Sequence, residues 1–134
     1  MALELTVQHP DFSYDELGEF SSDEVRQRIV DHAWDAERAE FIRQNADTGR
    51  ACPPSVYAAK SDDYCLHIYA TDADGFEAAV LVPRPHKLFG LLRLSATSSV
   101  IRTVDTLDEL LPLVDAFLAN DAQTMMDMLD REAV

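Results

Sequence analysis

A chain of 134 residues, 47% of them hydrophobic, has the size of one ordinary domain and is too apolar for a disordered acidic tail. Its formal net charge of −14 argues against nucleic acid or an anionic membrane as a direct partner, because phosphate groups require clustered Lys and Arg. No apolar run approaches the ~20 residues that span a bilayer, and no signal peptide is visible. We therefore expect a single cytoplasmic domain over residues 1–134.

The acidic residues concentrate at the two ends of the chain. Residues 1–50 carry a net charge of −7, residues 51–104 a net charge of 0 and residues 105–134 a net charge of −7. General solubility and adaptation to high salt both make proteins acidic, but salt adaptation should acidify every exposed segment. The alternative interpretation is a surface that binds a basic partner.

The first half of the chain predicts a strand, an acidic arm and a helix. Leu3 to Val7 alternates apolar and polar residues, as strands do. The arm up to residue 20 is either a partner-binding segment with aromatic anchors or a loop or short helix whose acids face water. Ser21 and Glu24 have capping-box spacing and open a helix predicted over residues 21–46. Residues 51–57, ACPPSVY, predict an extended connection.

Residues 62–104 predict an antiparallel meander, because runs rich in β-branched, aromatic and aliphatic residues alternate with turn signals. The runs are 64–70, 76–82, 88–94 and 99–104. Side-chain alternation makes both sheet faces partly apolar, with Tyr69 and Leu81 opposite the face of Leu66 and Ile68. Either helices cover both faces, or a partner covers one of them.

Two helices are predicted over residues 106–131, the first opening at the capping-box pair Thr106 and Glu109. Pro112 conflicts with a regular first helix, so we expect a kink or a late helix start there. The predicted fold class is therefore α+β: an antiparallel meander of four to five strands packed against one N-terminal helix and two C-terminal helices.

The segment TDADGFEAAV, residues 71–80, raises the question of a cation-binding loop. With Gly75 at the sixth position of an EF-hand loop, Ala70 and Leu81 occupy the first and twelfth positions, where acids are required. The segment instead predicts a hairpin turn in which Gly75 adopts a positive φ.

No other pattern in the chain suggests catalysis or a bound group. The four histidines share no ligand spacing with one another or with the two cysteines, which we expect to be free thiols, and no glycine-rich phosphate loop occurs. We therefore expect no metal, no cofactor and no enzymatic activity.

The meander followed by VDTLDELLPLVDAFLANDAQTMMDML, together with the small size and the acidity, resembles the small bacterial immunity proteins, which neutralise a toxin made by the same cell. This resemblance covers residues 62–130 and implies a tight basic partner whose active site is occluded. The predicted contact residues are Asp11, Tyr14, Asp15, Glu16 and Glu19 on the arm, and Asp105, Asp108 and Asp115 near the first C-terminal helix. A mimic of nucleic-acid charge is a variant of the same function.

Two functions of other classes remain open. Cys65, His67, Tyr69 and Trp34 could line a pocket between the sheet and the helices, in a small enzyme or ligand-binding domain. Alternatively, the second apolar sheet face or the Met-rich final helix could meet a second copy of the chain, which would make the protein a homodimer rather than a monomer.

Overall fold

The computed structural model describes residues 2–61, 64–71, 75–88, 92–121, 124, 125 and 128, and for residues 82–88 and 92–102 it describes the backbone alone. The elements run β1 (Leu3–Gln8), β2 (Tyr14–Phe20), α1 (Ser22–Asp31), α2 (Trp34–Thr48), β3 (Ser55–Ser61), β4 (Tyr64–Ala70), β5 (Phe76–Leu88), β6 (Leu92–Val104), a 3-10 turn η1 (Leu107–Leu110) and α3 (Leu111–Leu118).

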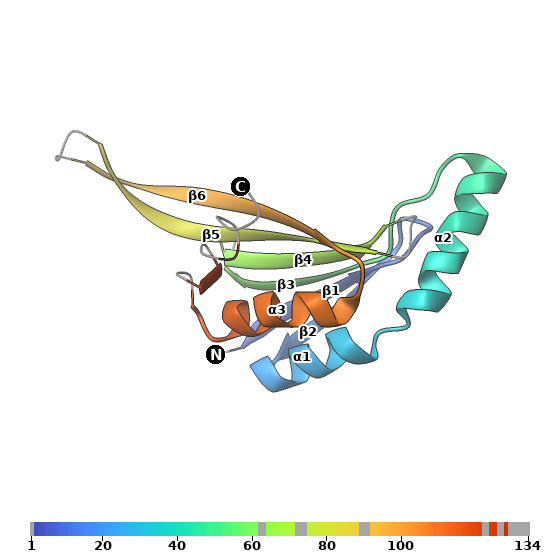
Figure 1. The fold of residues 1–134 in the computed structure, drawn as a ribbon, viewed down its shortest axis with the longest axis horizontal. Coiled ribbons are helices and arrows are strands. Elements are labelled where there is room, and N and C mark those ends of the chain that lie inside the picture. Colours follow the sequence, from blue (N-terminus) through green and yellow to red (C-terminus); the bar gives the residue numbers. More distant parts are fainter. Residues whose placement is uncertain are drawn as a thin grey trace.

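The strands form one antiparallel sheet in the order β2-β1-β3-β4-β5-β6. This confirms the α+β class, with six strands where four to five were predicted. Figure 1 shows α1 and α3 on the same side of the sheet, α2 leading away from one end of it, and the β5–β6 hairpin extending beyond the shorter strands.

The core lies between one face of this sheet and the helices. Leu66 and Ile68 of β4 are almost fully buried there, while their neighbours on the strand point to the other side. Phe117 of α3 is completely buried, and burial of each such large side chain contributes roughly 1.5–3 kcal/mol. The rest of the cluster includes Leu3, Leu5, Val25, Ile29, Val56, Ala78, Val80, Leu110, Leu113 and Val114.

The single helix predicted over residues 21–46 is wrong, because the chain forms two helices there. The capping box of Ser21 and Glu24 is present as predicted, but α1 ends at Asp31 and the backbone of His32 is extended, with a ψ of 142°. The Trp34 indole donates to the Ile29 carbonyl at 2.9 Å, which satisfies one of the acceptors left free at the end of α1. No Pro or Gly marks this break in the sequence.

The extended connection predicted at residues 51–57 is in part a central strand. β3 lies between β1 and β4, and it begins directly after Pro54. The missing proline N–H groups therefore do not interrupt the hydrogen-bonded ladder.

The last three predicted strand runs form only two strands, β5 and β6. β5 continues through Pro83 and Pro85 beyond Leu81, where its pairing with β4 ends. Beyond Leu81, β5 pairs with β6 alone. The other edge of β5 has no described strand to bond there, so prolines, which lack an N–H group, are tolerated.

The arm and the C-terminal segment also differ from their predictions. The acidic arm is the edge strand β2 and not a loop or short helix. Pro112 stands in the first turn of α3, which confirms the late helix start, and η1 precedes it. The second C-terminal helix falls largely on residues outside the described part of the chain.

Gly75 does not have the predicted positive φ. A Cβ at this position would lie 2.6 Å from the Val104 carbonyl oxygen, so a glycine is needed here because β5 and β6 approach each other closely. Asp72 and Asp74, the acids of the rejected cation loop, lie outside the described residues.

Candidate functional site

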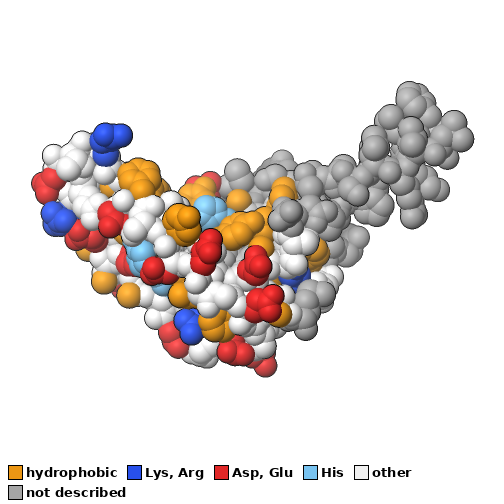
Figure 2. Space-filling model, turned by 180° about the vertical axis from the view of Figure 1, so that it is seen from behind, with side chains coloured by type: hydrophobic (Ala, Val, Ile, Leu, Met, Phe, Trp, Pro, Cys, Tyr) orange, Lys and Arg blue, Asp and Glu red, His pale blue; other side chains and the backbone are white. Residues whose placement is uncertain are grey.

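The sheet face turned away from the helices, which we call the open face, is the candidate site. It carries the residues that alternate with the core positions, and Figure 2, seen from behind, shows hydrophobic side chains gathered with acidic side chains beside them. Its described members on β1, β3, β4 and β5 include Glu4, Thr6, Gln8, Ser55, Tyr57, Cys65, His67, Tyr69 and Glu77. Of the two alternatives for the second apolar face, coverage by helices is wrong for the described residues.

Three rings form the centre of the open face. The rings of Tyr57 and His67, which are direct partners on β3 and β4, lie 5.9 Å apart, and those of His67 and Tyr69 lie 5.3 Å apart. Burial lowers the pKa of His67, and burial together with a hydrogen bond to Glu77 raises the pKa of Tyr69 to about 12. The rings of His67 and Tyr69 are therefore uncharged at neutral pH, which suits a desolvated contact.

A hollow of about 450 Å³ connects this centre to the edge strand β2. Its lining combines aromatic, hydroxyl and amide side chains: Thr6, Gln8, Tyr14, Ser55, Tyr57 and His67. Tyr14 is 62% exposed, and Ser55 at the floor is 3% exposed. A hollow of this size accommodates one or two side chains of a partner.

An acidic margin borders the open face on β1 and β2. The register places Glu19 directly opposite Glu4 and Glu16 opposite Thr6, so all three carboxylates lie on this face. Like charges directly opposite each other destabilise a sheet by a fraction of a kcal/mol. No cation among the described residues pairs with Glu4, Glu16 or Glu19.

The turn between β1 and β2 holds a strained aromatic residue. The His9 amide donates to the Ser13 carbonyl at 2.8 Å and the Phe12 amide to the His9 carbonyl at 3.0 Å, which leaves Pro10, Asp11 and Phe12 as a three-residue loop. Its third residue is in the left-handed region that glycine favours, and Phe12 occupies it with a φ of 71° and 55% of its surface exposed. The Asp11 side chain is fixed within the loop by the Ser13 amide at 3.0 Å.

The structure separates the predicted contact residues into two groups. Asp11, Tyr14, Asp15, Glu16 and Glu19 lie together on the turn and on β2, and Tyr14, Glu16 and Glu19 belong to the open face. Asp105 and Asp108 lie at the start of η1, and Asp115 lies on α3, which packs on the other face. Asp115 is already paired with Arg26, 2.6 Å from its Nε.

The predicted pocket shared by Trp34, Cys65, His67 and Tyr69 is wrong, because Trp34 lies on the opposite side of the sheet. Its ring contacts those of His32 and Phe76 with centroid distances of 4.5 and 5.4 Å. Cys65 and Cys52 are both free thiols, as expected.

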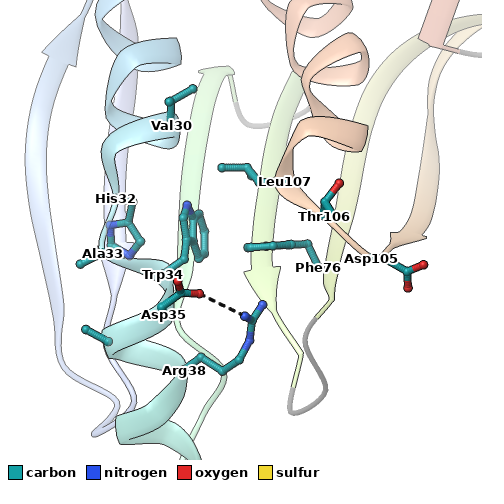
Figure 3. Close-up of a pocket in the computed structure, with 11 residues that line it drawn as sticks. Val30, His32, Ala33, Trp34, Asp35, Arg38, Phe76, Asp105, Thr106 and Leu107 are labelled. Atoms are coloured by element: carbon teal, nitrogen blue, oxygen red, sulfur yellow. Dashed lines mark ion pairs between the residues drawn. The ribbon is translucent and has the colours of Figure 1, made fainter.

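A second hollow, of about 530 Å³, lies beside Trp34 and Phe76, where α1 joins α2 (Figure 3). Arg38 is 7% exposed there and donates to the carbonyls of Thr71 at 3.2 Å and Gly75 at 2.7 Å, while Asp35 lies 3.6 Å from it. Its guanidinium also stacks over the Phe76 ring at 4.8 Å. Through these hydrogen bonds, Arg38 links α2 to Thr71 and Gly75, which lie between β4 and β5.

Nothing in the described residues builds a metal centre. They contain no group of three or more His, Cys, Asp or Glu side chains arranged to hold a metal ion. None of the helices in the described part of the chain is long and apolar enough to cross a membrane.

Sequence reasoning did not select Glu4 or Tyr57 for this site, and it included Phe12 only as one of the aromatic residues of the arm. The alternation of residues 3–7 already placed Glu4 on the polar side of its strand, so its signal was present. Tyr57 was missed with β3, and no local pattern indicated the left-handed backbone of Phe12. Comparison of the chain with protein-family models, with curated proteins and with solved structures gave no match.

Proposed function

We propose that this protein binds a basic partner protein through its open face and occludes the partner's functional surface. The observation that carries the proposal is the arrangement of that face, with an aromatic centre bordered by three carboxylates that pair with no cation among the described residues. Protein interfaces combine a desolvated aromatic core with a polar rim in this way. The carboxylates select a partner that carries Lys or Arg opposite them.

The turn that precedes β2 supports the same surface. A bulky residue in the left-handed region costs of order 1–3 kcal/mol, and Phe12 is neither buried nor packed in the core in return. Contact with a partner would give a physical reason for holding an exposed aromatic side chain in this strained backbone conformation. Phe12 and Tyr14 then serve as aromatic anchors at the end of the strand where the acidic residues begin.

The finer proposal is an immunity-type inhibitor of a bacterial toxin. It rests on the small size, the net charge of −14 and the α+β element order of the chain. A toxin that acts on nucleic acid presents a basic active site, and an acidic protein seated on that site excludes the anionic substrate.

Affinity capture followed by reconstitution tests the proposal. The immobilised protein should retain one stoichiometric protein from the cells that make it, and a salt gradient should release that protein. The purified partner is then titrated with the wild type and with two double variants of equal charge change, Glu16→Gln with Glu19→Gln and Asp105→Asn with Asp108→Asn.

The open-face pair of substitutions should weaken binding about tenfold or more, and the pair near η1 by less than about twofold. Equal losses would show that net charge alone matters and would overturn the open face as the site. The immunity proposal adds that expression of the partner alone arrests growth and that co-expression of this protein restores it. A harmless partner would refute that addition.

A further inference from the structure

Within the described part of the chain, the outer edge of β2 is an unpaired sheet edge. β2 is the terminal strand of the sheet and pairs with β1 alone, through the register from Gln8–Tyr14 to Leu3–Phe20. Six of its seven residues are exposed. Exposed edge strands present unpaired backbone N–H and C=O groups, which a strand of another protein can join.

The side chains of β2 determine which strand can join it. Its sequence YDELGEF contains three acids and no base. Asp15 lies on the helix side and already pairs with His9, whereas Glu16 and Glu19 lie on the open face. An added strand therefore meets the carboxylates of Glu16 and Glu19 on its open-face side. Opposite charges across a strand pair stabilise it and like charges destabilise it.

A second copy of the same chain is a poor occupant of this edge. Two β2 strands side by side would bring two acidic surfaces together with no base on either strand to pair with them.

We propose that the partner of this protein contributes an extended basic segment that pairs with the outer edge of β2 as a seventh strand of the sheet. This inference rests on the proposed function and adds the mode of binding. The backbone ladder holds the segment in place, and Lys or Arg side chains opposite Glu16 and Glu19 set its register. Side chains on the open-face side of the segment lie next to Tyr14, at the mouth of the hollow that leads to Tyr57 and His67.

The test uses a seven-residue peptide of alternating Lys and Val, blocked at both ends, and the isotope-labelled full chain at low salt. A control peptide has the same side chains with every backbone amide N-methylated, so it keeps the charge and cannot form the ladder. The readouts are the dissociation constant and the hydrogen-exchange protection of individual amides. We expect new protection at residues 14–20 with the first peptide, and binding of the control at least about tenfold weaker.

Glu16→Gln and Glu19→Gln should each weaken binding of the first peptide by about two- to fivefold, as expected for one cross-strand charge pair. Equal affinity of the two peptides would overturn strand addition, and so would new amide protection confined to Tyr57, His67 and Tyr69. Either result would leave the docking of a basic partner intact. If neither peptide binds, strand addition is also overturned, and the reconstituted partner decides the proposed function independently. Concentration-dependent dimers with protected β2 amides would identify a second copy as the occupant and refute the proposal.

Discussion

The imidazole Nδ1 of His9 lies 2.6 Å from Oε1 of Glu37, and this contact ties the turn before β2 to helix α2. The other ring nitrogen of His9 lies 2.9 Å from Oδ2 of Asp15 on β2. The second oxygen of Glu37 lies 3.3 Å from Nε2 of His32, at the end of α1. An imidazole between two carboxylates carries protons on both nitrogens, because a carboxylate cannot donate. His9 in its charged form therefore joins the edge strand to the helices.

The stability of the protein should fall as His9 loses its proton. The hydrogen bond to Asp15, followed by that to Glu37, raises the pKa of His9 above its ordinary value of 6.5, although burial opposes the shift. A group whose pKa is raised by folding contributes stability that is fully present below its unfolded pKa and is lost as the pH rises through its folded pKa. Urea unfolding from about pH 5.5 to pH 8.5 should therefore show a lower midpoint above the raised pKa.

The matched variant for this experiment is His9→Gln, which removes the titrating group and keeps a side-chain donor. It should lose the part of the pH dependence that His9 contributes. His67→Gln serves as the control, because burial lowers the pKa of His67 and so gives a dependence of the opposite sign. If His9→Gln and the wild type keep the same pH profile, the link between His9 and the two carboxylates does not contribute to stability.

Replacement of Phe12 by Gly should make the isolated protein more stable and its complex weaker. Glycine adopts the φ of 71° without strain, and the greater freedom of glycine in the unfolded chain offsets only part of that gain. We expect an increase of about 1 kcal/mol in the free energy of unfolding. Phe12→Ala keeps the strain and removes the aromatic ring, so it should weaken partner binding without stabilising the fold. A less stable Phe12→Gly variant would show that the ring supports the folded monomer.

The periodic pattern of apolar and polar residues, together with capping and proline residues, made most of the elements predictable. The strand at residues 3–7, the capping box at Ser21 and the late helix start at Pro112 all follow from local side-chain chemistry, and all are present. The break between α1 and α2 is different in kind, because it depends on Trp34 reaching the Ile29 carbonyl and packing on Phe76, which lies far along the chain on β5. β3 was not predicted, because Pro53 and Pro54 indicated an extended connection over residues 51–57. The strand begins at Ser55, directly after these prolines.

The candidate site was predictable in its charge and not in its geometry. Charge segregation alone pointed to the acids of residues 11–19, but a linear sequence does not reveal that Asp105 and Asp115 belong with the helices. It also does not reveal that Glu4 stands opposite Glu19, since this depends on the bulge at Leu17 that shifts the register by one residue. Had the ladder continued without the bulge, Glu19 would have faced the helices.

Gly75→Ala should destabilise the fold more than Gly49→Ala does. The added Cβ would meet the Val104 carbonyl oxygen at 2.6 Å, and because that oxygen is backbone, the ends of β5 and β6 would have to move apart. Overpacking of this kind costs typically about 1–3 kcal/mol. At Gly49, with a φ of 65° and no atom near the new Cβ, left-handed strain of about 1 kcal/mol is the expected loss. Urea unfolding of the two variants checks the order, and equal losses would contradict the close approach at Gly75.

Glu19→Lys should stabilise the isolated fold while it weakens the binding of basic ligands. The introduced ammonium group would stand opposite Glu4, so the substitution turns a like-charge pair into a cross-strand ion pair, with an expected gain of about 0.5–1 kcal/mol at low salt. The gain should shrink as salt rises above about 0.1 M, because both side chains lie at the surface. Asp108→Lys changes the net charge equally on η1 and should leave the affinity for the Lys-Val peptide within about twofold. Urea unfolding at two salt concentrations and peptide titration measure both effects. A loss of stability in Glu19→Lys would contradict the register of β1 and β2, and an unchanged peptide affinity would remove Glu19 from the binding surface.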